Sequence, residues 1–336
     1  AGFNMPLQYS SVKNEVLAVR NQVGVFDVSH MGEFFVEGKD AHAFVDYIIT
    51  NDFINAGDLK AVYSPLCRED GTVIDDLIAY KLGTNKVLIC VNASNIDKDW
   101  NWISKHTEGF DIELTNRSDD YSLLAIQGPQ AEAILKKLMI LDDADFPYYS
   151  ILQTQYKGHN LILARTGYTG EDGFEVFCPR QYTTALWDLI ISQKVTPCGL
   201  ASRDVLRIEV GYPLYGHEIY DQVTPLDSAL NWTVKSEKRK FIGKSALAAY
   251  QRKYRLIKII LEKGIPREGY DLVLENGEII GKVTSGTMSV VLGRGVALAH
   301  VDPTKFTNET QLFVDIRNKK YKAQFTSKPF VAGGHK

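Results

Sequence analysis

The alternation of apolar and polar residues predicts a chain of short helices and strands. Apolar positions recur with helical spacing at 12–23, 40–49, 96–106, 182–193 and 201–210. Strand-like runs occupy 61–67, 72–82, 86–91, 121–126, 150–157 and 160–165. The turns between the strands are short, and parallel pairing would need crossovers of about a dozen residues, so we expect antiparallel sheets. Ser94 or Asn95 is expected to cap the helix at 96–106.

The pattern changes after the charged run Lys235-Ser-Glu-Lys-Arg-Lys240, which we interpret as a domain boundary. Strands dominate beyond it, and Glu275-Asn-Gly-Glu278 between apolar runs is a strong hairpin signal. A chain of 336 residues is too long for one ordinary core, so two or three domains are expected. The predicted class is α+β with antiparallel sheets and a β-rich C-terminal domain.

Composition describes a soluble globular protein, with 45% hydrophobic and 24% charged residues. A net charge of −3 argues against a nucleic-acid partner, and the absence of an apolar run of about 20 residues argues against a membrane span. The chain opens AGFNMPLQYS, without the features of a secretory signal. The four cysteines are scattered, with no C-x-x-C and no histidine at ligand spacing, so we expect reduced thiols and no metal site.

Three glycines stand in the segment Arg165–Glu175 (RTGYTGEDGFE), between two apolar runs. Glycine lets a backbone or a flat ligand approach closely, so this spacing predicts a shaped loop between strands. Glu175 shares a strand face with Phe177, whereas Phe174 and Val176 point the other way. Either the loop is a tight turn with a solvated Glu175, or it is a pocket in which Tyr168 stacks on a ring and Glu175 accepts hydrogen bonds from N–H donors.

Two adjacent acids, Asp75 and Asp76, interrupt the apolar strand Val73-Ile-Asp-Asp-Leu-Ile-Ala79. Aspartate is disfavoured in strands, so the pair needs a reason. One interpretation is an edge strand or a bulge, with one acid in solvent and the other bonded to backbone. The other is a functional carboxylate in an apolar wall. Periodicity does not choose between the two acids, because both faces of the strand are apolar.

Basic residues provide two further candidates. Arg203 begins a predicted helix beside Asp204 and is either half of a surface ion pair or a fork for a substrate carboxylate. A basic cluster is either a solvated face or a docking site for an acidic partner. Its members are Lys235, Lys238, Arg239, Lys240 and Lys244.

An ordered series of motifs resembles the aminomethyltransferase (T-protein) family of the glycine cleavage system, which belongs to the wider folate-binding GcvT family. The series is MPLQY at 5–9, VFDVSHMGEF at 25–34, DDLI at 75–78, VNASN at 91–95, QGP at 127–129, RTGYTGEDGFE at 165–175, SRDVLRIE at 202–209, YGHEI at 215–219, FIGK at 241–244, VTSG at 283–286 and KPF at 328–330. The match runs nearly end to end, and this order makes it very specific for the wider family.

The resemblance implies a fold of three domains in a cloverleaf, with a barrel or jelly-roll-like domain at the C-terminus. The implied domains are residues 1–30 with 121–235, residues 31–120, and residues 240–336. The implied cofactor is tetrahydrofolate, and the implied partner is the lipoylated carrier protein (H-protein). The reaction moves a methylene group from the aminomethylated lipoyl arm to tetrahydrofolate, with release of ammonia and formation of 5,10-methylenetetrahydrofolate. The implied compartment is the cytoplasm, or the mitochondrial matrix in a eukaryote.

The resemblance also assigns roles to particular residues. It selects Asp76 as the catalytic acid, Glu175 as the group that holds the pterin edge, and Arg203 as the contact for the glutamyl tail. The remaining residues at folate-lining positions are Tyr63, Val91, Asn92 and Tyr168.

Two departures from the family pattern are a tail without the usual tyrosine after Phe330 and the shorter acid Asp227 in Pro225-Leu-Asp227. The rival readings are a folate-dependent demethylase and a non-catalytic folate-binding protein of iron–sulfur maintenance with the same fold.

Overall fold

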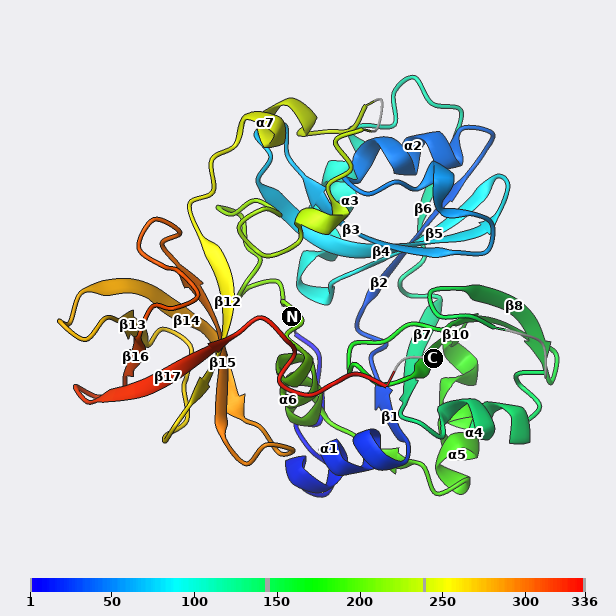
Figure 1. Cartoon of the computed structure of the whole chain (residues 1–336). Coiled ribbons are helices and arrows are strands. Elements are labelled where there is room, and N and C mark those ends of the chain that lie inside the picture. Colours follow the sequence, from blue (N-terminus) through cyan, green and yellow to red (C-terminus); the bar gives the residue numbers. More distant parts are fainter. Residues whose placement is uncertain (1, 143–145, 238–239, 335–336) are drawn as a thin grey trace.

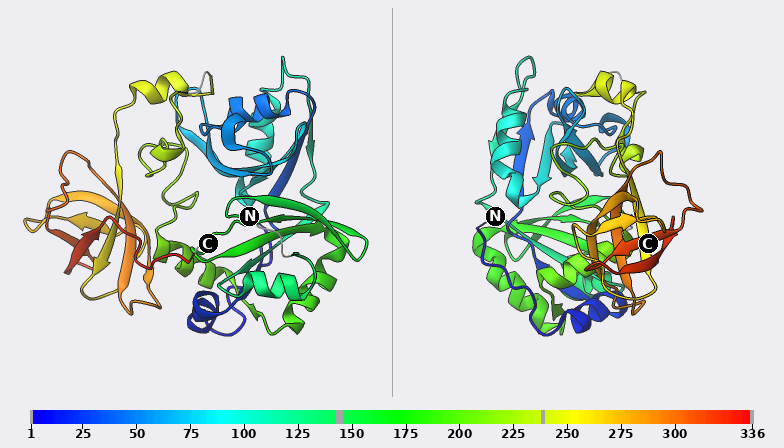
Figure 2. Two further views of the ribbon diagram at one scale, coloured as in Figure 1. Left: turned by 45° about the vertical axis from the view of Figure 1, so that its right-hand side comes forward. Right: turned by 90° about the vertical axis from the view of Figure 1, so that its left-hand side faces the viewer.

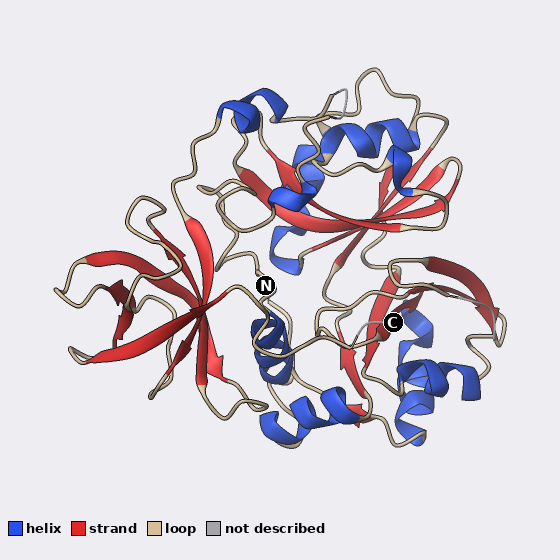
Figure 3. Ribbon diagram, viewed as in Figure 1, coloured by secondary structure: helices blue, strands red, loops and turns tan. Residues whose placement is uncertain are grey.

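Three β-sheets surround the centre of the molecule in the computed structural model, which describes residues 2–142, 146–237 and 240–334 (Figure 1). Two of the sheets are open and the third closes into a barrel. The chain contains many helices and many strands: the strands form these sheets, and helices pack beside them (Figure 3). The α+β class and the β-rich C-terminal part are therefore confirmed.

The five-stranded sheet is built from the segment in which the acid pair lies. Its order is β3 (Ala61–Cys67), β4 (Val73–Gly83), β5 (Lys86–Val91), β2 (Gly32–Glu37) and β6 (Glu113–Asn116). Helices α2 (Ala41–Ile48) and α3 (Ile96–Ser104) pack on one face through residues that include Phe44 and Ile103. The short helices η1 (Ile54–Ala56) and η2 (Ala93–Asn95) complete this part. Asn95 is the N-cap residue of α3, one of the two residues predicted there, but its side chain makes no capping hydrogen bond.

The six-stranded sheet contains the glycine loop. Its order is β11 (Thr196–Pro197), β1 (Gly24–Asp27), β7 (Tyr121–Gln127), β10 (Gly173–Pro179), β9 (His159–Ala164) and β8 (Ile151–Tyr156). Helices α4 (Ala131–Lys137) and α5 (Thr183–Ser192), with η3 (Arg180–Tyr182) before α5, cover its outer face. Among the described strands, the two-residue β11 pairs in parallel with β1, and every other pair is antiparallel. The antiparallel prediction fails only at this sheet edge.

The two open sheets lie one above the other (Figure 2) and share a hydrophobic core. Tyr80 of β4 and Phe177 of β10 meet edge to face across it, with ring centroids 5.5 Å apart. An antiparallel bridge between Lys60 and Ser150 ties the two sheets together at one edge. Helices α1 (Val12–Asn21) and α6 (Leu200–Val210) pack into the same core. Side chains on the inner faces of β4 and β10 therefore point into one common interior.

The C-terminal barrel is antiparallel and closed. It runs β12 (Arg255–Leu261), β15 (Gly295–Val301), β14 (Ile279–Met288), β13 (Asp271–Val273), β16 (Leu312–Asp315) and β17 (Lys320–Thr326). The connection to it carries η4 (Asn231–Thr233) and α7 (Lys244–Ala249). The predicted hairpin at 275–278 is confirmed, because the Leu274 N–H donates to the Glu278 carbonyl at 2.9 Å. Ile208 of α6 packs against Val296 and Leu298, which joins the barrel to the inter-sheet core.

We propose that the ranges 1–30 with 121–235, 31–120 and 240–336 are three domains, since each supplies every strand of one sheet. No helix in the described part of the chain combines the length and the apolar character that a membrane span requires.

Candidate active site

The acid pair lies in the interior strand β4, between β3 and β5, so the edge-strand interpretation is wrong. A β-bulge is present, because Leu66 pairs with Asp75 whereas the next residue, Cys67, pairs with Val73. Bulges re-aim side chains and are common beside active sites. After the bulge the two acids point to opposite faces of the sheet.

Asp76 shares the inner face of β4 with Ile78 and Tyr80, which belong to the core between the two sheets. It is half-buried, and two donors reach its carboxylate. Its Oδ2 accepts from the Tyr63 hydroxyl at 3.0 Å, and its Oδ1 accepts from the Asn92 amide at 3.1 Å. Burial, and then the neighbouring charge of Asp75, raise the pKa of Asp76 to about 7. A carboxyl with this pKa can gain and lose a proton near neutral pH.

Asp75 faces the other side of the sheet, toward α3, and is fully buried. Its carboxylate accepts from the Asn92 backbone N–H at 3.2 Å, the Asn92 amide at 2.9 Å and the Asn95 amide at 2.6 Å. Neither acid is therefore in open solvent, and Asn92 connects the two.

Tyr63 of β3 covers Asp76, and Trp232 covers Tyr63. The rings of Tyr63 and Trp232 stack with centroids 5.9 Å apart and an interplanar angle of 20°. Trp232 remains 54% exposed. Trp232 of η4 thus marks where the Asp76 region meets solvent. The sequence did not predict this role, because Trp232 and Tyr63 are far apart in the chain and meet only in the folded protein.

Glu175 lies on the inner face of β10, with Phe177 on its side and Phe174 and Val176 on the other, as the strand period predicts. It is only 7% exposed, so the solvated-turn interpretation is wrong. The Thr166 hydroxyl donates to its Oε2 at 2.5 Å. Burial is the main cause that raises the pKa of the Tyr149 phenol, and Tyr212 and then Glu175 add to it. The carboxylate therefore lies in an aromatic interior and has acceptor capacity for further donors.

The glycines of the loop are required by close contacts. A Cβ at Gly167 would lie 1.9 Å from Oε1 of Gln127, and one at Gly173 would lie 2.6 Å from the Ile126 carbonyl oxygen. Gly170 has a φ of +82°, which side chains rarely adopt. These contacts fix the loop that presents Tyr168, whose hydroxyl donates to the Pro213 carbonyl.

Arg203 of α6 points inward rather than to the surface. Asp204 pairs with Arg207 at 2.8 Å instead, so the surface ion-pair interpretation of Arg203 is wrong. The guanidinium lies 5.2 Å from the ring of Tyr168 and 5.9 Å from that of Phe26. Its Nη1 is buried without a hydrogen-bond partner among the described residues. Such a group is costly unless a ligand completes it.

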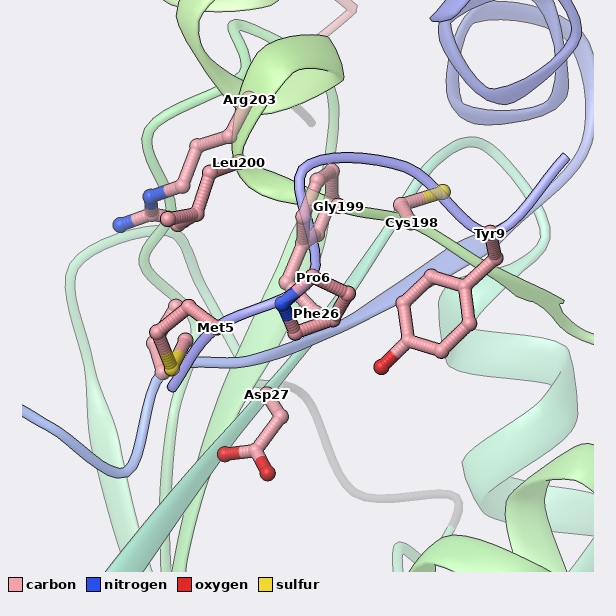
Figure 4. A pocket seen from close by; sticks show the side chains of 10 residues that line it. Met5, Pro6, Tyr9, Phe26, Asp27, Cys198, Gly199, Leu200 and Arg203 are labelled. Carbon is pink, nitrogen blue, oxygen red and sulfur yellow. The ribbon is translucent and has the colours of Figure 1, made fainter. Parts of the chain in front are cut away.

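A small pocket opens beside Arg203, beneath the N-terminal segment (Figure 4). Met5, Pro6 and Leu200 provide apolar walls, and Asp27 lies at its lower side in the figure. Arg203 thus belongs both to this pocket and to the wall around Tyr168.

The predicted residues converge unequally. Tyr63 and Asn92 both contact Asp76 directly, and Tyr168 lies near Tyr63. Glu175 and Arg203 are likewise electrostatic neighbours. Val91 differs, because it is fully buried in the core on the α3 side of the sheet.

The C-terminal tail runs from the barrel back to the glycine loop. Phe330 is buried against Ile208, the Val331 N–H donates to the Glu209 carbonyl at 2.9 Å, and the Gly334 N–H donates to the Gly170 carbonyl at 2.9 Å. The other family departure, Asp227, is fully buried and accepts from backbone and side-chain donors that include the Tyr250 hydroxyl at 2.8 Å. Asp227 therefore organises the connection to the barrel.

The basic cluster is partly described. Lys238 and Arg239 lie outside the described residues. Lys235 lies three residues after Trp232, and Nζ of Lys240 lies 4.9 Å from the ring centroid of Tyr47 on α2.

Comparisons with known proteins agree with this architecture of two open sheets and a barrel. Residues 1–238 match the GCVT N-terminal domain, and residues 253–332 match the glycine cleavage T-protein C-terminal barrel domain. The chain belongs to the folate-binding GCVT family of glycine cleavage T-protein aminomethyltransferases, as its motifs indicated.

Full-length relatives give the same result. The chain is 44% identical to an aminomethyltransferase of Thermosipho melanesiensis over 342 residues, which span 100% of this chain and 93% of the relative. It is 43% identical to an aminomethyltransferase of Staphylococcus epidermidis over 333 residues, with 97% and 92% of the two chains covered. The crystal structure of glycine cleavage system aminomethyltransferase T from Bartonella henselae superposes with a TM-score of 0.93 at 32% identity, over 99% of this chain and 93% of that one.

Proposed function

We propose that this chain moves a methylene group from the aminomethylated lipoyl arm of a carrier protein (H-protein) to tetrahydrofolate, releasing ammonia and forming 5,10-methylenetetrahydrofolate. The observation that carries the proposal is Asp76, a half-buried carboxyl whose pKa of about 7 suits proton transfer at neutral pH. Family membership and the full-length relatives support the activity.

Side chains on the inner faces of the two sheets have the chemistry that a reduced folate requires. Glu175 is a buried carboxylate with spare acceptor capacity, which suits the N–H edge of a pterin. Tyr168 offers a ring beside it, and Asn92 borders the acid end, whereas Val91 packs on the opposite side of the sheet. The unpartnered Nη1 of Arg203 suits the carboxylate of a glutamyl tail, since a guanidinium binds carboxylates through a planar fork. Tetrahydrofolate, when bound, supplies the amine nitrogens that accept the carbon.

Asp76 is the proposed catalytic residue. In its ionised form it orients the accepting nitrogen and takes the proton that this nitrogen loses as the new carbon–nitrogen bond forms. Tyr63 and Asn92 hold the carboxylate in place through hydrogen bonds of 3.0 and 3.1 Å. Burial makes these contacts stronger than they would be in water.

The carrier is proposed to dock where Trp232 is exposed, near the segment that carries the described lysines of the basic cluster, Lys235, Lys240 and Lys244. Trp232 stacks on Tyr63, and Tyr63 contacts Asp76, so two contacts lead from the exposed tryptophan to the acid. A positive face there suits an acidic carrier.

A carrier-dependent assay tests the proposal. Aminomethylated carrier and tetrahydrofolate are expected to yield ammonia and methylenetetrahydrofolate in equal amounts, with no product when the carrier is omitted. Turnover of an N-methyl or sulfonium substrate in place of the carrier would instead identify a demethylase. Folate binding without turnover of either substrate would identify a binding protein.

A further inference from the structure

Asp99 of α3 is a buried acid without a visible purpose in the chemistry described above. It is fully buried under the five-stranded sheet, on the side opposite Asp76. Neither of its carboxyl oxygens receives a hydrogen bond from an N–H or O–H group of the described residues. The carboxyl group of Asp75 lies within hydrogen-bond reach of it, so a hydrogen bond can join the two acids only if one of them is protonated.

Asp75 and Asp99 differ in the number of hydrogen-bond donors that surround them. Asp75 accepts from the Asn92 backbone N–H, the Asn92 amide and the Asn95 amide. Three such donors favour the ionised form of a carboxyl group. Asp99 has none, so its ionised form would lie in the interior without compensation.

Two carboxyl groups in hydrogen-bond contact must share a proton, because like charges at that distance repel strongly in a buried site. The donor pattern assigns the proton to Asp99. We propose that Asp99 is a neutral acid whose O–H donates to Asp75, and that it is a positioning residue for Asp76 through Asp75 and Asn92.

The charges that face Asp99 agree with this assignment. Asp75 faces it from β4, the charge of Asp76 acts on it from the other face of that strand, and Lys98 on its own helix is the cation that acts on it. Nζ of Lys98 is directed to the Tyr215 hydroxyl at 2.6 Å and lies 3.8 Å from Asp221, so it does not pair with Asp99. Burial, and then the charge of Asp75, raise the pKa of Asp99 to about 11.

The consequence for Asp76 runs through one amide group. Nδ2 of Asn92 lies 2.9 Å from Oδ1 of Asp75, 3.1 Å from Oδ1 of Asp76 and 3.0 Å from the Asp76 carbonyl oxygen. The O–H of Asp99 keeps Asp75 ionised and fixed in place. Asp75 in turn holds Asn92 against Asp76, and its charge adds to burial in raising the pKa of Asp76.

The proton itself can be observed without substrate. Infrared difference spectra between the full-length protein and its Asp99→Asn variant are expected to show a protonated carboxylic acid band that the variant lacks. The spectra are taken at about pH 9.5, because Asp76 and the buried Glu33 have lower pKa values of about 7 and about 8 and are ionised there. Asp97→Asn, the same change at an exposed position of the same helix, should retain the band. A full-length protein without an Asp99-dependent acid band would overturn the proposal.

The kinetic part of the test rests on the proposed function. Asp99→Asn keeps a neutral donor toward Asp75, so kcat should stay within about 3-fold, whereas Asp99→Leu should lower kcat by about 10- to 100-fold through misplacement of Asp76. The Kd for tetrahydrofolate should change little in either variant. A loss in Asp99→Asn as large as that in Asp99→Leu would overturn the role of a neutral donor. If the unaltered protein transfers no methylene group, the proposed function fails, and the infrared band still decides the proton.

Discussion

The hydroxyl of Tyr63 on β3 donates a 3.0 Å hydrogen bond to Oδ2 of Asp76 on the neighbouring strand β4. A hydrogen bond to the ionised form of an acid lowers its pKa, so this contact opposes the raising effects of burial and of Asp75. Tyr63 therefore helps to set the pH at which Asp76 becomes a base.

Replacing Tyr63 with phenylalanine tests this relationship. Loss of the donor should raise the pKa of Asp76, so the acid limb of the kcat–pH profile should move to higher pH by about 1 unit. The rate should fall by up to about 10-fold at neutral pH and recover at higher pH, where Asp76 is ionised again. Tyr321→Phe on the barrel is the matched control, and an unmoved acid limb in Tyr63→Phe would contradict the role of this hydrogen bond.

Glu175→Gln is expected to weaken folate binding rather than the chemical step. A neutral amide in the buried position of Glu175 loses the charged acceptor for pterin N–H groups, which costs about 1.5–3 kcal/mol, or about 10- to 100-fold in Kd. Isothermal titration with tetrahydrofolate measures the change, with the exposed Glu262→Gln on the barrel as the control. Unchanged affinity combined with a large loss of kcat would assign Glu175 to the chemistry instead.

Arg203→Met separates binding of the glutamyl tail from binding of the ring. The variant should bind tetrahydrofolate about 10- to 100-fold more weakly, because a charge-assisted pair is lost. Its affinity for tetrahydropteroate, which lacks the glutamyl tail, should equal that of the unaltered protein. Its melting temperature should not fall, because the buried Nη1 has no partner among the described residues to lose. Equal losses for the two ligands would place Arg203 elsewhere in the binding site.

Much of this arrangement follows from sequence periodicity, and part of it cannot. The strand period correctly placed Glu175 with Phe177 and away from Phe174, because alternation along one strand is a local property. It could not choose between Asp75 and Asp76, because both faces of β4 are covered by apolar layers, and the bulge beside them depends on pairing with β3. The resemblance to the family made that choice instead.

Long-range packing set the remaining limits. Arg203 is followed by Asp204 in the sequence, but on α6 the guanidinium of Arg203 points toward Tyr168 and Asp204 pairs with Arg207. Asn95 is a residue type that often caps helices, yet its amide donates a hydrogen bond to Asp75 on strand β4. In both cases a local preference was outweighed by a buried group that needed a partner, which only the folded chain reveals.

Glu33 provides a prediction about stability. It is fully buried on β2, neither carboxyl oxygen has a partner among the described residues, and burial raises its pKa to about 8. The folded chain therefore keeps a proton that the unfolded chain loses above about pH 4.3. The stability linked to this proton is complete below that pH and is lost as pH rises toward about 8.

The Glu33→Gln variant cannot titrate at this position. The free energy of unfolding of the variant, relative to that of the unaltered protein, should therefore increase between about pH 5 and about pH 8, by at most about 1.4 kcal/mol per pH unit. Melting temperatures measured across this pH range follow the change. Glu37→Gln, an exposed position on the same strand, is the control. A difference that stays constant over this range would mean that Glu33 is ionised in the folded protein.

The most direct measurement is the single-turnover rate of methylene transfer in Asp76→Asn, taken together with its Kd for tetrahydrofolate. The amide preserves shape but removes the base, so we expect the rate to fall by about 10²–10⁴-fold while Kd changes little, with the exposed Asp58→Asn as control. A normal rate in Asp76→Asn, with the loss found in Asp75→Asn instead, would contradict the assignment of Asp76 as the catalytic acid.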